Sequence, residues 1–265
     1  MTGFSLNQAT TKHWALDDLV AGCVSAGVEA VGLWREDVQA YGVDKAAALV
    51  RDAGLTVSSL CRGGFFSSPD WYDENRRAIE EAAALGTDTL VLVSGGLTGR
   101  DLDACRRHVG EAIGALVPDA LAAGVRLAIE PLHPMFCSDR CVVATIGQAL
   151  DLAAPYPAEA VGVVVDTYHL WWDDQVWEKI AEAGRAGRIA AFQLADWITP
   201  LPEGVLLGRG LPGTGCIDLR RFAAEVRAAG YQGWTEVEVF NADVWARPGA
   251  EVLDEAYAGY RAAVS

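Results

Sequence analysis

The segment Ala123-Gly124-Val125-Arg126-Leu127-Ala128-Ile129-Glu130 contains, in order, a helix end, a glycine, a short apolar run and a carboxylate. Glycine just past a helix end is a common left-handed stop. An apolar run without alternation is typical of a strand that is buried on both faces. The same order of helix end, glycine and apolar run recurs at residues 26–34, 53–60, 85–93, 186–192 and 229–237. This repeat predicts parallel strands that alternate with helices.

Two further apolar runs, at residues 4–7 and 161–165, complete a set of eight predicted strands. Helical stretches lie between them, for example at residues 44–54, 70–85, 101–123 and 218–229. Pro118 predicts a kink or a break in the third of these. Eight strand–helix units in 265 residues, with no linker-like stretch, favour a single (β/α)8 TIM barrel over residues 1–265. The alternative is an open, doubly wound sheet.

The composition argues against several classes of partner. The formal net charge is −15, and such a field repels phosphate backbones and anionic lipid, so we expect no nucleic acid and no membrane as a partner. The sequence has no run of roughly 18 apolar residues, and its first residues lead us to expect no signal peptide. The six cysteines lie mostly in apolar surroundings and lack zinc-finger spacing. These features favour a cytoplasmic protein.

A potential metal ligand stands at the end of four predicted strands: Glu130, Asp166, Gln193 and Glu238. The chemistry of a barrel is located at the carboxyl ends of its strands, so these side chains are expected to meet in one site. Each alone has an ordinary explanation, such as an ion pair or a helix cap, but four coincident placements favour a cation. Oxygen ligands of this kind suit Mg²⁺ or Mn²⁺.

Glu236 competes with Glu238 for the role of ligand, because residues two apart on a strand share a face. Glu238 lies nearer the carboxyl end of its strand, so we expect it to be the ligand. Glu236 is then expected to lie deeper and to hold a positively charged partner.

Two histidines and two arginines fall in segments that follow predicted strands. His133 and His169 each lie three residues beyond a proposed ligand, where either serves as a general base or as a donor to substrate. Arg62 and Arg209 lie in glycine-rich segments, where a guanidinium binds substrate hydroxyls or a carboxylate.

Four tryptophans cluster after strands two, six and seven of the predicted barrel: Trp34, Trp171, Trp172 and Trp197. Aromatic rings at a barrel mouth suit the apolar face of a sugar or cyclitol ring, and we select Trp34 and Trp197 as substrate-binding candidates. The competing interpretation is packing between helices and barrel.

The chain resembles the xylose isomerase-like barrel family of sugar isomerases and epimerases over nearly its whole length. The resemblance is strongest in four segments: Ile129-Glu130-Pro131-Leu132-His133-Pro134, Asp166-Thr167-Tyr168-His169, Phe192-Gln193-Leu194-Ala195-Asp196-Trp197 and Glu236-Val237-Glu238-Val239-Phe240. By this resemblance, His169 contacts the substrate and Arg209 binds it.

The family arranges Glu, Asp, His and Glu around one divalent cation, and this chain matches three of the four. Glu130, Asp166 and Glu238 agree with the pattern, whereas Gln193 stands where the family usually has His. Because an amide oxygen is a harder ligand than imidazole, the departure favours Mn²⁺ or Mg²⁺ over Zn²⁺ as the cofactor.

The chemistry implied by the resemblance is removal of a proton from the carbon beside a ketone. A metal that holds adjacent carbonyl and hydroxyl oxygens of a keto sugar or keto-cyclitol stabilises an enediolate, and reprotonation gives isomerisation or epimerisation. Candidates for the base are Glu130 and His133, with Glu238 or His169 as the partner. Relatives are often dimers or tetramers, so a homo-oligomer is expected.

Several other functions remain open at this point. The first alternative is a lyase that uses the same enolisation to cleave 3-keto-C-glycosides, together with a small partner subunit; a dehydratase follows similar logic. An endonuclease for abasic DNA needs more histidines and a basic groove than this chain offers. The last alternative is a sugar-binding protein with an inactive site.

Overall fold

The computed structural model describes residues 3–265 and confirms the predicted barrel. Within these residues, eight parallel strands close in the order β1-β10-β7-β6-β5-β4-β3-β2. The barrel strands are β1 (Phe4–Asn7), β2 (Ala30–Trp34), β3 (Thr56–Gly64), β4 (Thr89–Val93), β5 (Arg126–Ile129), β6 (Val161–Asp166), β7 (Ile189–Leu194) and β10 (Thr235–Val237). A closed barrel, and not the open sheet, is therefore the fold.

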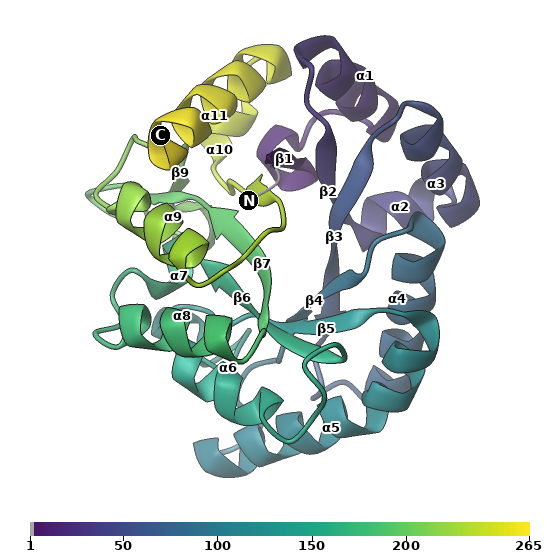
Figure 1. Cartoon of the computed structure of the whole chain (residues 1–265), viewed down its shortest axis with the longest axis vertical. Helices are drawn as coiled ribbons and strands as arrows, with labels where there is room; N and C mark the ends of the chain where they lie inside the picture. The colour runs from purple at the N-terminus through teal and green to yellow at the C-terminus, as the bar shows by residue number, and fades with distance from the viewer. Residues whose placement is uncertain (1–2) are drawn as a thin grey trace.

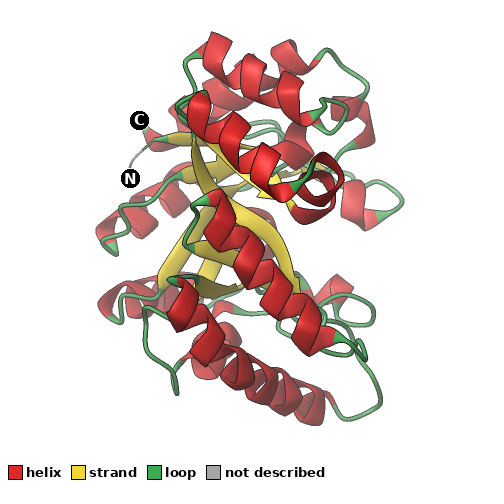
Figure 2. Cartoon of the chain, turned by 90° about the vertical axis from the view of Figure 1, so that its right-hand side faces the viewer, coloured by secondary structure: helices red, strands yellow, loops and turns green. Residues whose placement is uncertain are grey.

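Helices surround the strands as an outer ring (Figure 1), and a side view shows them covering the strands (Figure 2). The longer helices are α1 (Leu16–Ala26), α2 (Arg35–Tyr41), α3 (Val43–Asp52), α4 (Trp71–Leu85), α5 (Leu102–Ala123), α6 (Ile146–Ala153), α8 (Val176–Arg185), α9 (Leu219–Ala228) and α11 (Gly249–Val264). Short helices are η1 (Gln8–Thr11), η2 (Pro134–Phe136), α7 (Thr167–Leu170), η3 (Val205–Leu207) and α10 (Ala242–Trp245). None of the helices within residues 3–265 is long and apolar enough to cross a membrane.

Two details differ from the expectations. The sequence predicted a kink or a break at Pro118. A break is wrong, because α5 is one continuous helix from Leu102 to Ala123 with the proline inside it. A small antiparallel sheet of β8 (Asp196–Trp197) and β9 (Arg209–Gly210) was not anticipated. Both of its strands are two residues long, which is too short for hydrophobic periodicity to detect.

The interior of the barrel is divided between apolar and polar side chains. Strands β3 to β7 contribute a buried apolar cluster of Cys61, Val91, Ala128, Val164 and Ala191. Strands β1, β3, β7 and β10 contribute buried polar residues: Ser5, Asn7, Ser59, Gln193 and Glu236. Polar groups inside a barrel need internal hydrogen bonds, so this second set forms the floor of the site described next.

Candidate active site

The carboxyl ends of three strands bring three buried carboxylates together. Asp166 is the last residue of β6, and Glu130 and Glu238 directly follow β5 and β10. Glu130 and Glu238 are 5% and 3% exposed, and Asp166 is fully buried. Glu130 and Glu238 line a cavity of about 520 Å³, a size that suits a monosaccharide or a similar small molecule.

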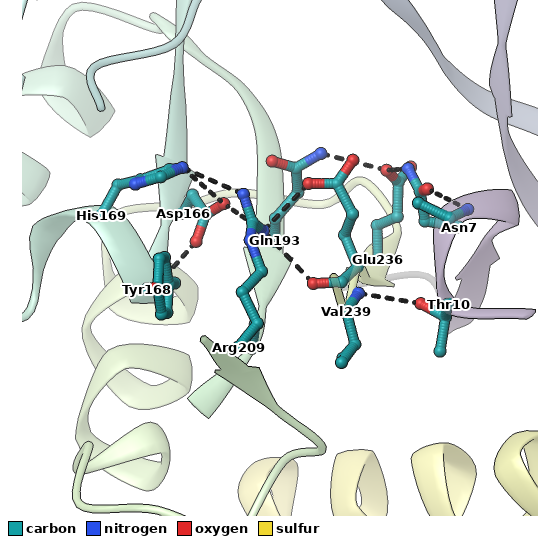
Figure 3. Close-up of polar contacts among 12 residues, drawn as sticks. Asn7, Thr10, Asp166, Tyr168, His169, Gln193, Arg209, Glu236 and Val239 are labelled. Carbon is teal, nitrogen blue, oxygen red and sulfur yellow. Dashed lines mark hydrogen bonds and ion pairs between the residues drawn. The ribbon is translucent and has the colours of Figure 1, made fainter. Parts of the chain in front are cut away.

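Arg209 is the buried counter-ion of two of these carboxylates, and Figure 3 shows its side chain beside Asp166. Its Nη1 lies 2.9 Å from Asp166 Oδ2 and 2.9 Å from Glu238 Oε2. The other oxygen of Asp166 accepts a hydrogen bond from the backbone N–H of Tyr168 at 2.8 Å and so caps α7. Asp166 therefore acts as a helix cap and as an ion-pair partner at once.

Three buried carboxylates share this region with one guanidinium, so the region is short of positive charge. Burial is the main reason that the pKa of Glu130 lies well above its usual range, and the charges of Glu238 and Asp166 raise it further. Burial also raises the pKa of Glu238 to about 8, although Arg209 acts in the opposite direction. Such values are typical of carboxyl groups that exchange protons near neutral pH or that bind a cation.

His169 is buried next to this cluster and is held from both sides. Its Nδ1 lies 3.2 Å from the backbone N–H of His133, and its Nε2 lies 2.9 Å from Arg209 Nη2. Burial and the charge of Arg209 lower the pKa of His169 well below its usual range, so the ring is neutral. A neutral imidazole accepts only one hydrogen bond, so one of these two donors lacks a matching lone pair.

His133 occupies a different position from the one expected of a base. The residue is half-buried, burial lowers its pKa, and its Nδ1 accepts a hydrogen bond from the backbone of Met135 at 3.2 Å. Its ring packs against Trp197 and Trp172, with centroid distances of 5.1 Å and 5.4 Å. His133 is not among the residues that line the cavity.

The two ends of the Gln193 amide, near the end of β7, have different surroundings. Its Nε2 donates to Glu236 Oε1 at 3.1 Å, while its Oε1 is buried with no hydrogen-bond partner in residues 3–265. In Figure 3 the amide nitrogen points to Glu236 and the oxygen points the other way, towards the side of Asp166. The expected positive partner of Glu236 is wrong: the hydrogen bonds to its carboxylate come from neutral side chains.

The donor set fits a hard divalent cation. Ligand atoms of Glu130, Asp166 and His169 lie within 4.8 Å of one another. Glu238 Oε1, like Gln193 Oε1, is buried and has no hydrogen-bond partner in the described part of the chain. Unpaired buried oxygens are costly, and a cation would satisfy them. Carboxylate and amide oxygens suit Mg²⁺ or Mn²⁺.

Aromatic side chains form much of the cavity wall, but only one of the two selected tryptophans is among them. Trp34 lines the cavity together with Phe65, Phe136, Tyr168, Phe240 and Trp245. Arg62 also lines it, with its guanidinium 4.3 Å from the Phe65 ring centre. Trp197 lies behind this wall, stacked on Tyr168 at 5.0 Å, and so supports the wall without lining the cavity.

Asp196 is a positioning residue that the sequence patterns did not single out. Its buried carboxylate accepts hydrogen bonds from the backbone N–H groups of Gly213, Gly215 and Ile217 at 2.9–3.0 Å. Asp196 also belongs to β8, which pairs with the β9 strand that carries Arg209. The loop around Arg209 is thus tied to the barrel at both ends. The only sign of this role in the sequence was that Asp196 lies in the segment Phe192-Gln193-Leu194-Ala195-Asp196-Trp197, which carries part of the family resemblance.

Comparison with known proteins identifies the family of the chain. The sequence pattern of the xylose isomerase-like TIM barrel matches residues 20–258. The chain belongs to the xylose isomerase-like TIM-barrel family. A crystal structure of protein SMc04130 from Sinorhizobium meliloti 1021 is 45% identical, with a TM-score of 0.95 over 98% of both chains.

Two further matches are a curated protein and a solved structure. An inosose isomerase of Halalkalibacterium halodurans is 28% identical over 137 residues, which are 50% of this chain and 46% of that protein. The chain therefore spans about half the length of this curated relative. A crystal structure of the IOLI protein with a bound zinc atom is 21% identical, with a TM-score of 0.83 over 100% of this chain and 98% of that one. At this identity the likeness shows a shared fold.

Proposed function

We propose that this protein is a divalent-metal-dependent isomerase or epimerase of a keto sugar or keto-cyclitol. The observation that carries the proposal is the meeting of three buried carboxylates and an unpartnered amide oxygen beside one cavity at the carboxyl end of the barrel. Membership of the xylose isomerase-like TIM-barrel family and likeness to an inosose isomerase support the choice of substrate class.

Glu130, Asp166, Gln193 and Glu238 would hold the cation, which we expect to be Mn²⁺ or Mg²⁺. When bound, the cation supplies Lewis acidity to a carbonyl oxygen and lowers the cost of forming an enediolate. The oxygen-rich donor set supports these two metals. The zinc atom in the IOLI structure is a property of that protein and does not identify the metal of this one.

The protein's own groups supply the proton transfer and the orientation of substrate. Glu130 and Glu238 line the cavity and have raised pKa values, so we assign them as base and acid on the α-carbon and the neighbouring oxygen. His133 is displaced from this role because it lies outside the cavity lining. His169, kept neutral by burial, and Arg209 would bind substrate oxygens.

The cavity wall matches the shape and polarity of such a substrate. Trp34, Phe65 and Phe240 offer apolar faces for the C–H faces of a sugar or cyclitol ring, and Arg62 reaches the same space. A cavity of about 520 Å³ has room for one such ring.

The proposal is tested by turnover in D₂O with Mn²⁺ and a panel of keto-inositols, ketohexoses and 3-keto glycosides. Isomerisation or epimerisation should proceed with deuterium entering the carbon beside the ketone. Glu130→Gln should lower kcat by about 10²–10⁴ while the protein stays folded, since one general base contributes that much. Arg76→Met, on the outer face of α4, should leave turnover unchanged.

Two outcomes would decide against the proposal. Absence of deuterium uptake with every keto compound would exclude enolisation. Cleavage of the 3-keto glycosides without epimerisation would assign the protein to the lyase alternative, in which the same enolisation expels a leaving group.

A further inference from the structure

The carboxylate of Glu236 sits in a closed cradle of hydrogen-bond donors below the metal ligands. Ser58 and Ser59 donate to its Oε2 at 2.6 Å and 2.8 Å. Asn7 Nδ2 and Gln193 Nε2 donate to its Oε1 at 2.7 Å and 3.1 Å. Four donors converge on two oxygens, and an acceptor-only group is the partner that satisfies them all.

Asn7 has a single orientation that satisfies its neighbours. Its Oδ1 accepts from the backbone N–H of Ala9 and from Trp34 Nε1, each at 2.9 Å. Both groups are obligate donors, so the carbonyl oxygen of Asn7 must face them and its NH₂ must face Glu236. The indole of Trp34 in the cavity wall is thereby joined through Asn7 to the cradle.

Gly32 provides the space for this carboxylate. A Cβ atom at that position on β2 would lie 2.5 Å from Glu236 Cδ, closer than side-chain atoms can approach. Glu236 is only 3% exposed, and its carboxylate lies against this bare backbone, where four hydrogen bonds hold it. The cradle is therefore rigid at the point where it meets Gln193.

We propose that Glu236 is a positioning residue that fixes the orientation of the Gln193 amide. A carboxylate accepts only from the NH₂ end, so the NH₂ of Gln193 must face Glu236 and its Oε1 must point away from Glu236, towards the side of Asp166 (Figure 3). The opposite orientation would turn N–H groups towards the proposed cation and repel it. Glu236 thus determines that Gln193 offers an oxygen, which favours hard cations. This inference rests on the proposed metal site.

The test is a double-mutant cycle on Mn²⁺ affinity, measured by isothermal titration calorimetry. Glu236→Gln frees the Gln193 amide to rotate and should weaken Mn²⁺ binding by about 10- to 100-fold, as lost support for a metal ligand usually does. In a Gln193→Ala background, the same Glu236→Gln change should leave the affinity nearly unaltered. That background separates the effect of the amide from the loss of a nearby negative charge.

Two companion variants sharpen the cycle. Gly32→Ala displaces the carboxylate but keeps its charge, and should weaken Mn²⁺ binding only while Gln193 is present. Arg76→Met, at an exposed position on α4, is the control, and the Mn²⁺ affinity should not change. Circular dichroism checks that each variant is folded, and if Glu236→Gln is not, Gly32→Ala takes its place in the cycle.

The outcomes distinguish this inference from the proposed function. If the unmodified protein binds no Mn²⁺ or Mg²⁺, both fall together. If it binds Mn²⁺ and Glu236→Gln weakens binding equally with and without Gln193, Glu236 acts by charge alone and the positioning role is wrong.

Discussion

Arg209 Nη1 lies 2.9 Å from Asp166 Oδ2, and both side chains are buried. The same nitrogen lies 2.9 Å from Glu238 Oε2, so one guanidinium serves two carboxylates. Asp166 and Glu238 are also among the proposed metal ligands. A cation would therefore compete with Arg209 for its partners, and the side chain is expected to balance the charge of the metal-free site.

Arg209→Met should destabilise the metal-free protein, because it leaves buried carboxylates without a counter-ion. The free energy of unfolding at pH 8 is expected to fall by about 3 kcal/mol, the size usual for breaking a buried pair. Added Mn²⁺ should then raise the melting temperature of the variant more than that of the unmodified protein. Urea denaturation and calorimetry with and without Mn²⁺ measure both effects.

Arg76→Met is the matched control, since Arg76 is 45% exposed and pairs with Asp119 at 3.5 Å on the surface. Its loss should change the unfolding free energy by less than about 1 kcal/mol. Equal effects of the two substitutions would show that Arg209 does not act as the buried counter-ion.

Stability of the metal-free protein should fall as the pH rises from 6.5 to about 8. The pKa of Glu238 rises from 4.5 to about 8 on folding, and that of Glu130 is raised as well, so the native state holds protons that the unfolded state has lost. Unfolding free energy decreases with pH wherever the native state binds more protons. Below pH 6.5 the lowered pKa of His169 acts in the opposite direction, so the window above it isolates the carboxyl groups.

Mn²⁺ should prevent the fall in unfolding free energy between pH 6.5 and 8, because a cation binds the deprotonated carboxylates. The increase in melting temperature caused by Mn²⁺ is therefore expected to grow across the same pH window. A metal-induced shift that stays constant from pH 6.5 to 8 would contradict the raised pKa values of the two glutamates.

Gln193→His should shift the preference of the site towards softer cations. Imidazole nitrogen suits Zn²⁺ better than an amide oxygen does, so the ratio of the Mn²⁺ to the Zn²⁺ dissociation constant should rise by about tenfold or more. Competition titrations measure the ratio. The exposed substitution Gln175→His should leave it unaltered, and an unchanged ratio in Gln193→His would remove Gln193 from the ligand set.

Gly32→Ala should lower the free energy of unfolding by about 1–3 kcal/mol, the usual cost of inserting a methyl group into a filled interior. The added Cβ would meet the Glu236 carboxylate at 2.5 Å. Gly99→Ala, with no atom within 4 Å of the added Cβ, should change stability by less than about 0.5 kcal/mol. Urea denaturation compares the two, and similar values would indicate that the barrel interior adapts freely around Glu236.

Much of the barrel could be predicted from the chain alone, because its strands are apolar runs bounded by glycine stops. The predicted apolar runs that end at Ile129 and at Val93 are the strands β5 and β4, which end at the same residues. Prediction was weaker where local signals conflict with packing. Pro118 is a helix breaker by its own chemistry, yet α5 continues through it.

Part of the candidate site also followed from the sequence, since strand ends in a barrel share one rim. The positions of Glu130, Asp166 and Glu238 after their strands indicated a common site, and the structure brings all three to Arg209 or to one cavity. Spacing did not reveal that His133 would turn away from the cavity towards Trp197.

The sequence by itself determined the order of strands and helices and the residue types at the barrel rim, because these depend on local periodicity and composition. Only the tertiary structure decided which hydrogen-bond partners those side chains have. The partners of Glu236 come from β1, β3 and β7, and Arg209 reaches Asp166 across 43 positions of the chain. No local pattern specifies such contacts, since they arise when the sheet closes and places distant strands side by side.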